Sequence, residues 1–241
     1  MNAPVEKSWV PLNHRERRVL GVLVEKAKTT PEYYPLTIAA IVTGSNQKSN
    51  RDPITNFDAD DVEEILQGLR KKGAVVMVEA GGRVVRWKHT LYDWLKVTKV
   101  ELAVIAELLL RGAQTEGDLR ARAGRMEPLP DLAALQTVIE SLVAKDLVVY
   151  LSPPGVRRGV VVTHNLYPPN ELDREKARQA AAPALDDEPE RPARPAPARL
   201  ESAPAVSPDE LARLRADLEA LREQVHALSA EVRELKSALG A

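Results

Sequence analysis

An internal duplication constrains the fold of this chain more than any other feature of its sequence. A stripe of apolar residues at helical spacing occurs twice, and each member of the second stripe follows its counterpart by 73 residues: Val62, Ile65, Leu66 and Leu69, then Leu135, Val138, Ile139 and Leu142. The same offset continues through the pairs Lys72/Lys145, Val75/Val148 and Val76/Val149. Because periodic positions at one fixed offset are hard to obtain by chance, the sequence predicts two copies of one structural unit.

The first unit, residues 12–95, is predicted to contain three helices and a β-hairpin. Helices are expected over about 14–28, 35–44 and 58–73. Asn13 with Glu16, and Asp58 with Asp61, have the spacing of residues that cap a helix N-terminus. The segments AVVMVE and RVVRWKHT, separated by glycines, predict the hairpin. Three helices followed by a hairpin are typical of a winged helix.

The second unit, residues 96–170, repeats this order. Thr98 with Glu101 has the spacing of another capping box, Thr115 has the position of a helix N-cap, and the second apolar stripe supplies a third helix. A second hairpin is expected to end on THNLY, which resembles KHTLY at the end of the first. The predicted fold class is therefore mainly α with small β-hairpin wings, α+β overall, arranged as two tandem winged-helix domains.

The composition changes after the second unit. Residues 171–206 are dominated by alanine, proline, arginine and glutamate, and such a segment cannot bury a core. We expect a disordered, flexible linker with polyproline II character, and an ordered extended arm is the alternative.

The C-terminal residues 207–240 are predicted to form a coiled-coil helix. Ser207, Pro208 and Glu210 have the positions of a strong helix start. Apolar residues then recur at alternating spacings of three and four, as in a heptad seam: Leu211, Leu214, Leu218, Leu221, Val225, Leu228, Val232, Leu235 and Leu239. Charges of opposite sign flank the seam, which favours a parallel homodimer. The alternative is one amphipathic helix that docks on its own domain.

Three segments carry a resemblance to a known family: YPLTIAAIVTGSNQKSNRDP, RKKGAVV and ELAVIAELLLRGAQTEGDLRARAGRM. On these segments the chain resembles the YceH-like family of uncharacterised bacterial proteins, over roughly residues 12–168. The resemblance implies tandem winged helices, in agreement with the repeat. It implies no activity, because the biochemical role of that family is not established, and it does not extend to the linker or the coiled coil.

No sequence pattern predicts catalysis. The four histidines, His14, His89, His164 and His226, include no pair at metal-ligand spacing. His89 and His164 occupy matched positions in the two units, so a structural role at strand ends is expected. We therefore expect no enzyme activity, no cofactor and no metal.

The compartment is predicted from what the sequence lacks. It contains no cysteine, no secretory signal in its first residues and no apolar run near the roughly 18 residues of a membrane span. A cytoplasmic protein with no membrane partner is expected.

The charge pattern bears on DNA binding, which winged helices often perform with their third helix. Net charge is +3 over residues 1–170 and −4 over residues 171–241. The first half of the predicted third helix carries five carboxylates that would repel phosphate: Asp58, Asp60, Asp61, Glu63 and Glu64. DNA contacts are therefore expected at the wings and at a short helix, through Arg83, Arg86, Lys88, Arg120, Arg122, Arg125, Arg157 and Arg158. An ordinary solvated face is the alternative for these residues.

A polar loop after the second helix is the remaining candidate site, and it comprises Asn46, Gln47, Lys48, Ser49, Asn50, Arg51 and Asp52. It is expected to pin the two units together, with Arg51 paired to Asp52 or bridging the repeats. The alternative is a recognition surface in which Lys48 and Arg51 bind an anionic group.

Together these patterns predict a non-enzymatic binding protein that dimerises through its tail. A DNA-associated transcriptional regulator is narrowly favoured, because the fold suggests it. The alternative is a protein–protein interaction adaptor that does not bind DNA, which the acidic third helix would suit.

Overall fold

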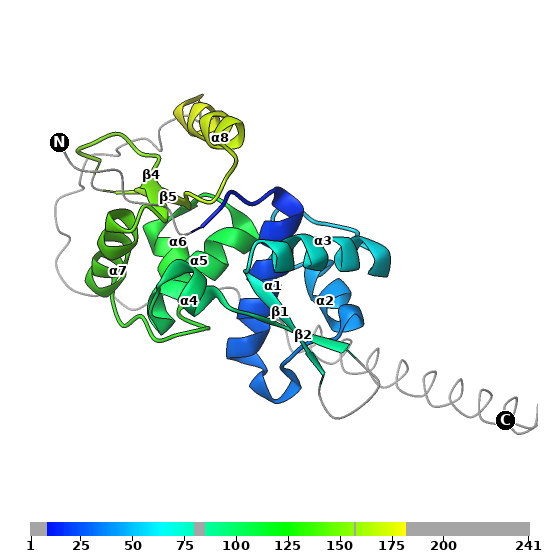
Figure 1. Cartoon of the computed structure of the whole chain (residues 1–241). Helices are drawn as coiled ribbons and strands as arrows, with labels where there is room; N and C mark the ends of the chain where they lie inside the picture. The colour runs from blue at the N-terminus through cyan, green and yellow to red at the C-terminus, as the bar shows by residue number, and fades with distance from the viewer. Residues whose placement is uncertain (1–8, 80–84, 157, 182–241) are drawn as a thin grey trace, which may run out of the picture. The chain divides into compact units, whose positions relative to one another are not determined.

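The computed structural model describes residues 9–79, 85–156 and 158–181. Over these ranges the chain combines helices with small antiparallel sheets (Figure 1). The first half contains α1 (His14–Thr29), the 3-10 helix η1 (Pro31–Tyr33), α2 (Ile38–Ser45), α3 (Ala59–Lys71), β1 (Val75–Glu79), β2 (Val85–His89) and α4 (Leu91–Leu95). The second half contains α5 (Lys99–Arg111), β3 (Gln114–Thr115), α6 (Glu116–Ala123), α7 (Leu132–Ala144), β4 (Val148–Tyr150), β5 (Val161–His164) and α8 (Pro169–Ala181). None of the helices in these ranges is long and apolar enough to cross a membrane.

The predicted helix starts are confirmed where a capping residue marks them. Asn13 and Glu16 form a reciprocal capping box on α1, with N–H to side-chain oxygen distances of 2.9 and 3.0 Å. Equivalent boxes begin α3 and α5, and Thr115 caps α6. Each cap satisfies backbone N–H groups that have no partner inside the helix.

The predicted start of the second helix is wrong by three residues. The helix begins at Ile38, capped by Thr37, and does not include Pro35. Leu36 is extended instead, because its backbone exchanges hydrogen bonds of 2.8 and 3.1 Å with Trp87 on β2. The bridge fixes the segment before α2 to the first hairpin.

Both predicted hairpins have antiparallel strands. In the first, β1 pairs with β2 in the register Val75↔His89. In the second, β4 pairs with β5 in the register Val148↔His164. The short strand β3 also pairs with β5, so the second sheet has the order β3-β5-β4, and this third strand was not predicted.

One hydrophobic core runs through both halves. Seven of the eight residues of the duplicated stripes are buried in it, and Val138 packs against it half-buried. The most extensive contact between helices joins α1 to α5, the first helices of the two repeats (Figure 1). The core is therefore continuous across the predicted boundary at residues 95/96.

The predicted linker and coiled coil are largely untested by the structure. The linker was expected to begin at residue 171, but residues 171–181 are helical, as part of α8. This segment holds the helix-forming residues before the proline-rich stretch, so the linker prediction began too early. Residues 182–241, including every residue of the predicted dimer seam, lie outside the described residues.

Candidate functional site

The predicted binding loop follows α2 and is held in place by Arg51. The Arg51 side chain is fully buried, and its NH1 and NH2 groups donate to the Glu25 carboxylate at 3.1 and 2.5 Å. Its Nε donates to the Gly44 carbonyl at 2.9 Å, and NH1 donates to the Asn50 carbonyl at 2.8 Å. This bidentate pair ties the loop to α1. It supports the structural interpretation of Arg51, but the partner is Glu25 and not Asp52.

Two asparagines of the loop also bind inward. Asn46 exchanges hydrogen bonds with the backbone of Phe57, donating at 2.7 Å and accepting at 2.8 Å. The Asn50 side-chain oxygen accepts from Arg111 at the end of α5. The loop therefore bridges the two repeats, as the first interpretation predicts.

The other members of the predicted site face outward or lie half-buried. Gln47 is half-buried, and three side chains are exposed: Lys48, Ser49 and Asp52. A recognition surface on this loop is therefore limited to these side chains, and Arg51 does not contribute to it.

Arg18 of α1 is a second buried arginine beside the loop, and only 3% of it is exposed. Its NH2 donates to the carbonyls of Pro53 at 2.6 Å and Leu110 at 3.3 Å, and its NH1 donates to the Ser45 carbonyl at 3.1 Å. Ser45 and Leu110 lie at the C-terminal ends of α2 and α5, so the guanidinium lies at the negative ends of two helix dipoles. Burial, and then the charge of Arg51, lowers the pKa of Arg18 to about 10. It therefore remains charged at neutral pH.

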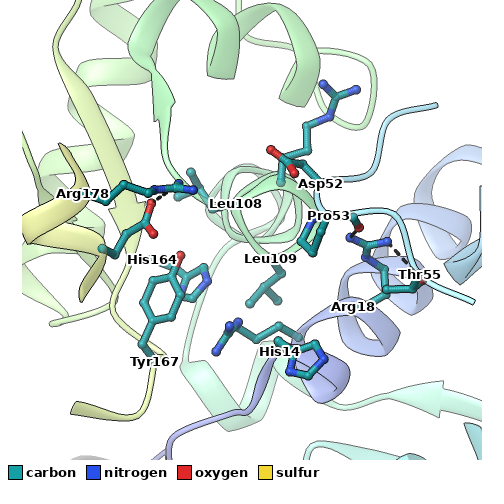
Figure 2. Close-up of a pocket in the computed structure, with 14 residues that line it drawn as sticks. His14, Arg18, Asp52, Pro53, Thr55, Leu108, Leu109, His164, Tyr167 and Arg178 are labelled. Atoms are coloured by element: carbon teal, nitrogen blue, oxygen red, sulfur yellow. Dashed lines mark hydrogen bonds and ion pairs between the residues drawn. The ribbon is translucent and has the colours of Figure 1, made fainter. Parts of the chain in front are cut away.

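A hollow of about 150 Å³ lies between this loop, the first half of α1, the end of α5 and the segment from β5 to α8. Figure 2 shows His164 and Tyr167 on one side of Leu109, with Arg18 and Thr55 on the other. Residues of both repeats thus line one concave site.

The two strand-end histidines have the structural role that was predicted. His89 ends β2 and His164 ends β5, and each ring accepts a backbone N–H through Nδ1, from Leu91 at 3.3 Å and from Leu166 at 3.2 Å. Burial lowers the pKa of His89 to about 4 and lowers the pKa of His164 well below its ordinary value. Both rings are therefore neutral near pH 7. His164 differs from His89 because it also lines the hollow.

Several predicted nucleic-acid residues are engaged within the fold. Arg86 and Arg120 donate to backbone carbonyls, at 2.9 Å and at 3.3 to 3.4 Å. Arg122 donates to the Gln114 side chain at 2.5 Å. These contacts stabilise local structure and leave each guanidinium less free to bind phosphate.

The remaining cations of that set are exposed or not described. Lys88, Arg125 and Arg158 are exposed, whereas Arg83 and Arg157 lie outside the described residues. Arg125 follows α6 and is not part of it, because that helix ends at Ala123.

The N-terminal half of α3 presents a negative surface. Asp58 and Asp61 form its capping box, and Asp61 also pairs with Arg15. Three further carboxylates on this half are exposed: Asp60, Glu63 and Glu64. The α7 helix of the second repeat instead exposes Gln136, Thr137 and Glu140 over the corresponding turns.

Sequence reasoning missed the buried arginines of α1. The segment HRERR resembles the solvated start of a helix, yet Arg17 and Arg18 are buried together with every residue through Val24. The cause is the central position of α1, which contacts α2, α3 and α5. In the sequence, the apolar run that begins at Val19 is the feature that could have indicated this burial.

Comparisons with known proteins give a family but no activity. The family described as "Protein of unknown function, DUF480" matches residues 12–155. The "UPF0502 protein RB6530" of Rhodopirellula baltica is 47% identical over 178 residues, which are 72% of this chain and 74% of that protein. The "UPF0502 protein" of Geotalea daltonii is 51% identical over 136 residues, 56% of this chain and 62% of that protein. The "UPF0502 protein" of Geotalea uraniireducens is 49% identical over 147 residues, 61% of this chain and 64% of that protein. The chain thus spans slightly less than two thirds of the two Geotalea proteins.

Proposed function

This chain belongs to the DUF480 family of proteins of unknown function, and we propose that it is a non-enzymatic adaptor that binds a basic protein partner through α3. The adaptor is built of two tandem winged helices and acts as a homodimer through residues 207–240. Its cysteine-free composition is that of a protein of the reducing cytoplasm.

The order of elements supports the winged-helix part of this proposal. Each half has three helices followed by an antiparallel pair of strands: α1, α2, α3 and β1–β2, then α5, α6, α7 and β4–β5. The resemblance to the YceH-like family implies the same architecture. In this arrangement α3 and α7 are the third helices, which winged helices commonly use for recognition.

The exposed negative surface of α3 is the main observation in favour of a basic protein partner. Asp60, Glu63 and Glu64 are exposed on its N-terminal half. A DNA phosphate chain at this surface would be repelled, whereas a protein surface rich in Lys and Arg would be attracted and oriented. Charge complementarity of this kind mainly raises association rate and specificity.

A DNA-associated regulator is the second candidate. The exposed cations Lys88 on β2, Arg125 after α6 and Arg158 in the second hairpin favour it. Their contacts would be with phosphates, which position a protein on DNA without reading its sequence.

One pair of measurements on the full chain separates the two candidates. In-cell crosslinking followed by mass spectrometry should capture basic proteins on the wild type. The triple variant Asp60→Asn, Glu63→Gln, Glu64→Gln should lose them, since it removes the negative surface while leaving the capping residues Asp58 and Asp61 in place. Glu140→Gln on α7 is the matched control and should capture the same proteins as the wild type.

DNA binding is measured on the same proteins by fluorescence anisotropy with a mixed-sequence duplex. The adaptor predicts no saturable binding by the wild type at physiological salt. Saturable binding would instead support the regulator, provided that the logarithm of the binding constant falls with the logarithm of the salt concentration. The slope of that plot should be about −0.9 for each phosphate contact. Identical crosslinked proteins in the wild type and the triple variant would contradict recognition through α3.

A further inference from the structure

The hollow beside the loop has the size for a small ion or a single acidic group. Its volume is about 150 Å³. Pockets for drug-sized ligands are roughly 300 to 1,000 Å³. The hollow therefore suits a small occupant.

His164 offers this hollow a buried hydrogen-bond donor. It is 1% exposed, its ring stacks on Tyr167 at a centroid distance of 3.9 Å, and it lines the hollow (Figure 2). Since Nδ1 accepts the N–H of Leu166, Nε2 carries the proton of the neutral ring. Nε2 is therefore the ring atom that can donate to a ligand in the hollow.

The cations around His164 are already held in position. Arg17 is 8% exposed, pairs with Glu171 at 2.7 Å and lies over the Tyr167 ring. Arg111 is held by Glu107 at 3.1 Å and by the Asn50 side chain. Guanidiniums fixed in this way lose little freedom when they bind a ligand.

The charge balance of the lining favours an anion. Four arginines line the hollow, Arg17, Arg18, Arg111 and Arg178, against the carboxylates Asp52 and Glu175. Glu175 is paired with Arg178 at 2.6 Å, both within α8. The Arg18 guanidinium donates to three backbone carbonyls and to the Thr55 hydroxyl, and the nearby charges of Asp52 and Glu25 offset only part of its own.

We propose that this hollow is a binding site for a small oxyanion, a phosphate or carboxylate group, which accepts hydrogen bonds from His164 Nε2 and from the remaining N–H groups of Arg17 and Arg111. The buried charge of Arg18 adds a favourable field. The exposed carboxylate of Asp52, at the edge of the site, opposes the anion and limits its affinity. This site concerns a small molecule and is independent of the macromolecular partner of α3.

The test follows the side-chain nitrogen signals of the histidines by NMR in the full chain labelled with ¹⁵N-histidine. Sodium phosphate and sodium acetate are titrated separately, at fixed pH and at ionic strength held constant with sodium chloride. The His164 signal should shift saturably below about 10 mM anion, a concentration at which a ligand of millimolar affinity is mostly bound. The His89 signal should not move, because His89 makes the same backbone contact but does not line the hollow.

The two anions distinguish the sources of the acidic group. Saturation by phosphate but not acetate assigns a phosphate-bearing ligand, and saturation by acetate assigns a carboxylate. A His164 signal that neither anion shifts overturns the proposal.

Two variants test the assignment of the donors. His164→Asn keeps a side-chain acceptor near the Nδ1 position and removes the Nε2 donor, so the anion should bind about tenfold more weakly or worse, as judged by the anion-dependent rise in melting temperature. His89→Asn is its matched control and should retain the full anion response.

Asp52→Asn covers the case in which His164→Asn does not fold. The Asp52 side chain is exposed, so this variant should fold and bind the anion several-fold more tightly. An anion response equal to that of the wild type in Asp52→Asn, or undiminished in a folded His164→Asn, would show that the anion binds elsewhere.

Discussion

Arg51 is the residue on which the conformation of the polar loop depends. Its guanidinium reaches the Glu25 carboxylate on α1, the Gly44 carbonyl at the end of α2 and its neighbour Asn50. A bidentate pair of this kind fixes position as well as charge, because both planar groups must align. The loop that sequence reasoning singled out as a candidate recognition site is thus first a structural connection.

Replacement of Arg51 by alanine should lower the free energy of unfolding by about 3 kcal/mol, since it leaves the Glu25 carboxylate and a buried carbonyl without their donor. Urea denaturation of the full chain measures this. Lys48→Ala in the same loop is the matched control, because the Lys48 side chain is exposed. Its effect should stay within about 0.5 kcal/mol. Equal denaturation midpoints for the two variants would contradict the structural role of Arg51.

Sequence reasoning could find the loop but not its partners. The density of Asn, Gln, Asp and Arg pointed to internal hydrogen bonding, and Asn46 and Asn50 do bind inward. The ion-pair partner Glu25 is 26 residues away on another element, so only the packing of α1 beside α2 brings it near. The hollow was missed for the same reason, because its lining comes from four separate segments.

Among the elements, the close contact of α1 with α5 joins the two repeats. It depends on Gly21, at which an added Cβ atom would lie 2.8 Å from two side-chain atoms of Leu110 and 3.4 Å from the Ala106 carbonyl. Leu110 is fully buried in the core, so moving it would require its packed neighbours to shift. A small residue at this position therefore sets how closely the two helices approach.

Gly21→Ala should destabilise the chain by about 1 kcal/mol, because overpacking costs roughly 1 to 3 kcal/mol and outweighs the gain in helix propensity. Gly68→Ala on α3 is the matched control. Its added Cβ meets its nearest neighbour, a Glu16 side-chain oxygen, at 3.6 Å, which is ordinary contact. That variant should be stabilised by up to about 1 kcal/mol. Thermal denaturation of both variants measures these effects. Melting temperatures that shift in the same direction in Gly21→Ala and Gly68→Ala would contradict the tight contact at Gly21.

Elements with a strong local signal were predictable from sequence, and those formed by context were not. The capped helices α1, α3, α5 and α6 begin where their caps indicate. The five-residue helix α4 is too short for a periodic stripe, and α8 has no buried residue that would create one. The two-residue strand β3 exists only because β5 lies beside it. Local propensity carries no information on such pairings.

At the scale of the whole molecule, the duplication has produced two unequal halves around one core. Both halves bury three of the four stripe positions, and Val138 packs half-buried where Ile65 is buried, so the two repeats share most of their packing. Their surfaces differ, since α3 is acidic on its exposed N-terminal half whereas α7 is nearly neutral, and the loop that Arg51 holds exists in the first half alone. The halves therefore share a scaffold and present different faces to partners.

The assembly of the molecule is predicted to depend on the heptad seam of residues 207–240. In the full chain, the double variant Leu214→Glu, Leu221→Glu places charges at two core positions of the seam, and buried unpaired charges of this kind oppose association. Ala220→Glu, which the heptad pattern predicts on the outer face of the same helix, is the matched control. Sedimentation equilibrium should give twice the chain mass of 26.5 kDa for the wild type and the control, and the single-chain mass for the double variant. A monomeric wild type would end the idea of a homodimer, and a double variant that remained dimeric would move the dimer contact from the tail to the two repeats.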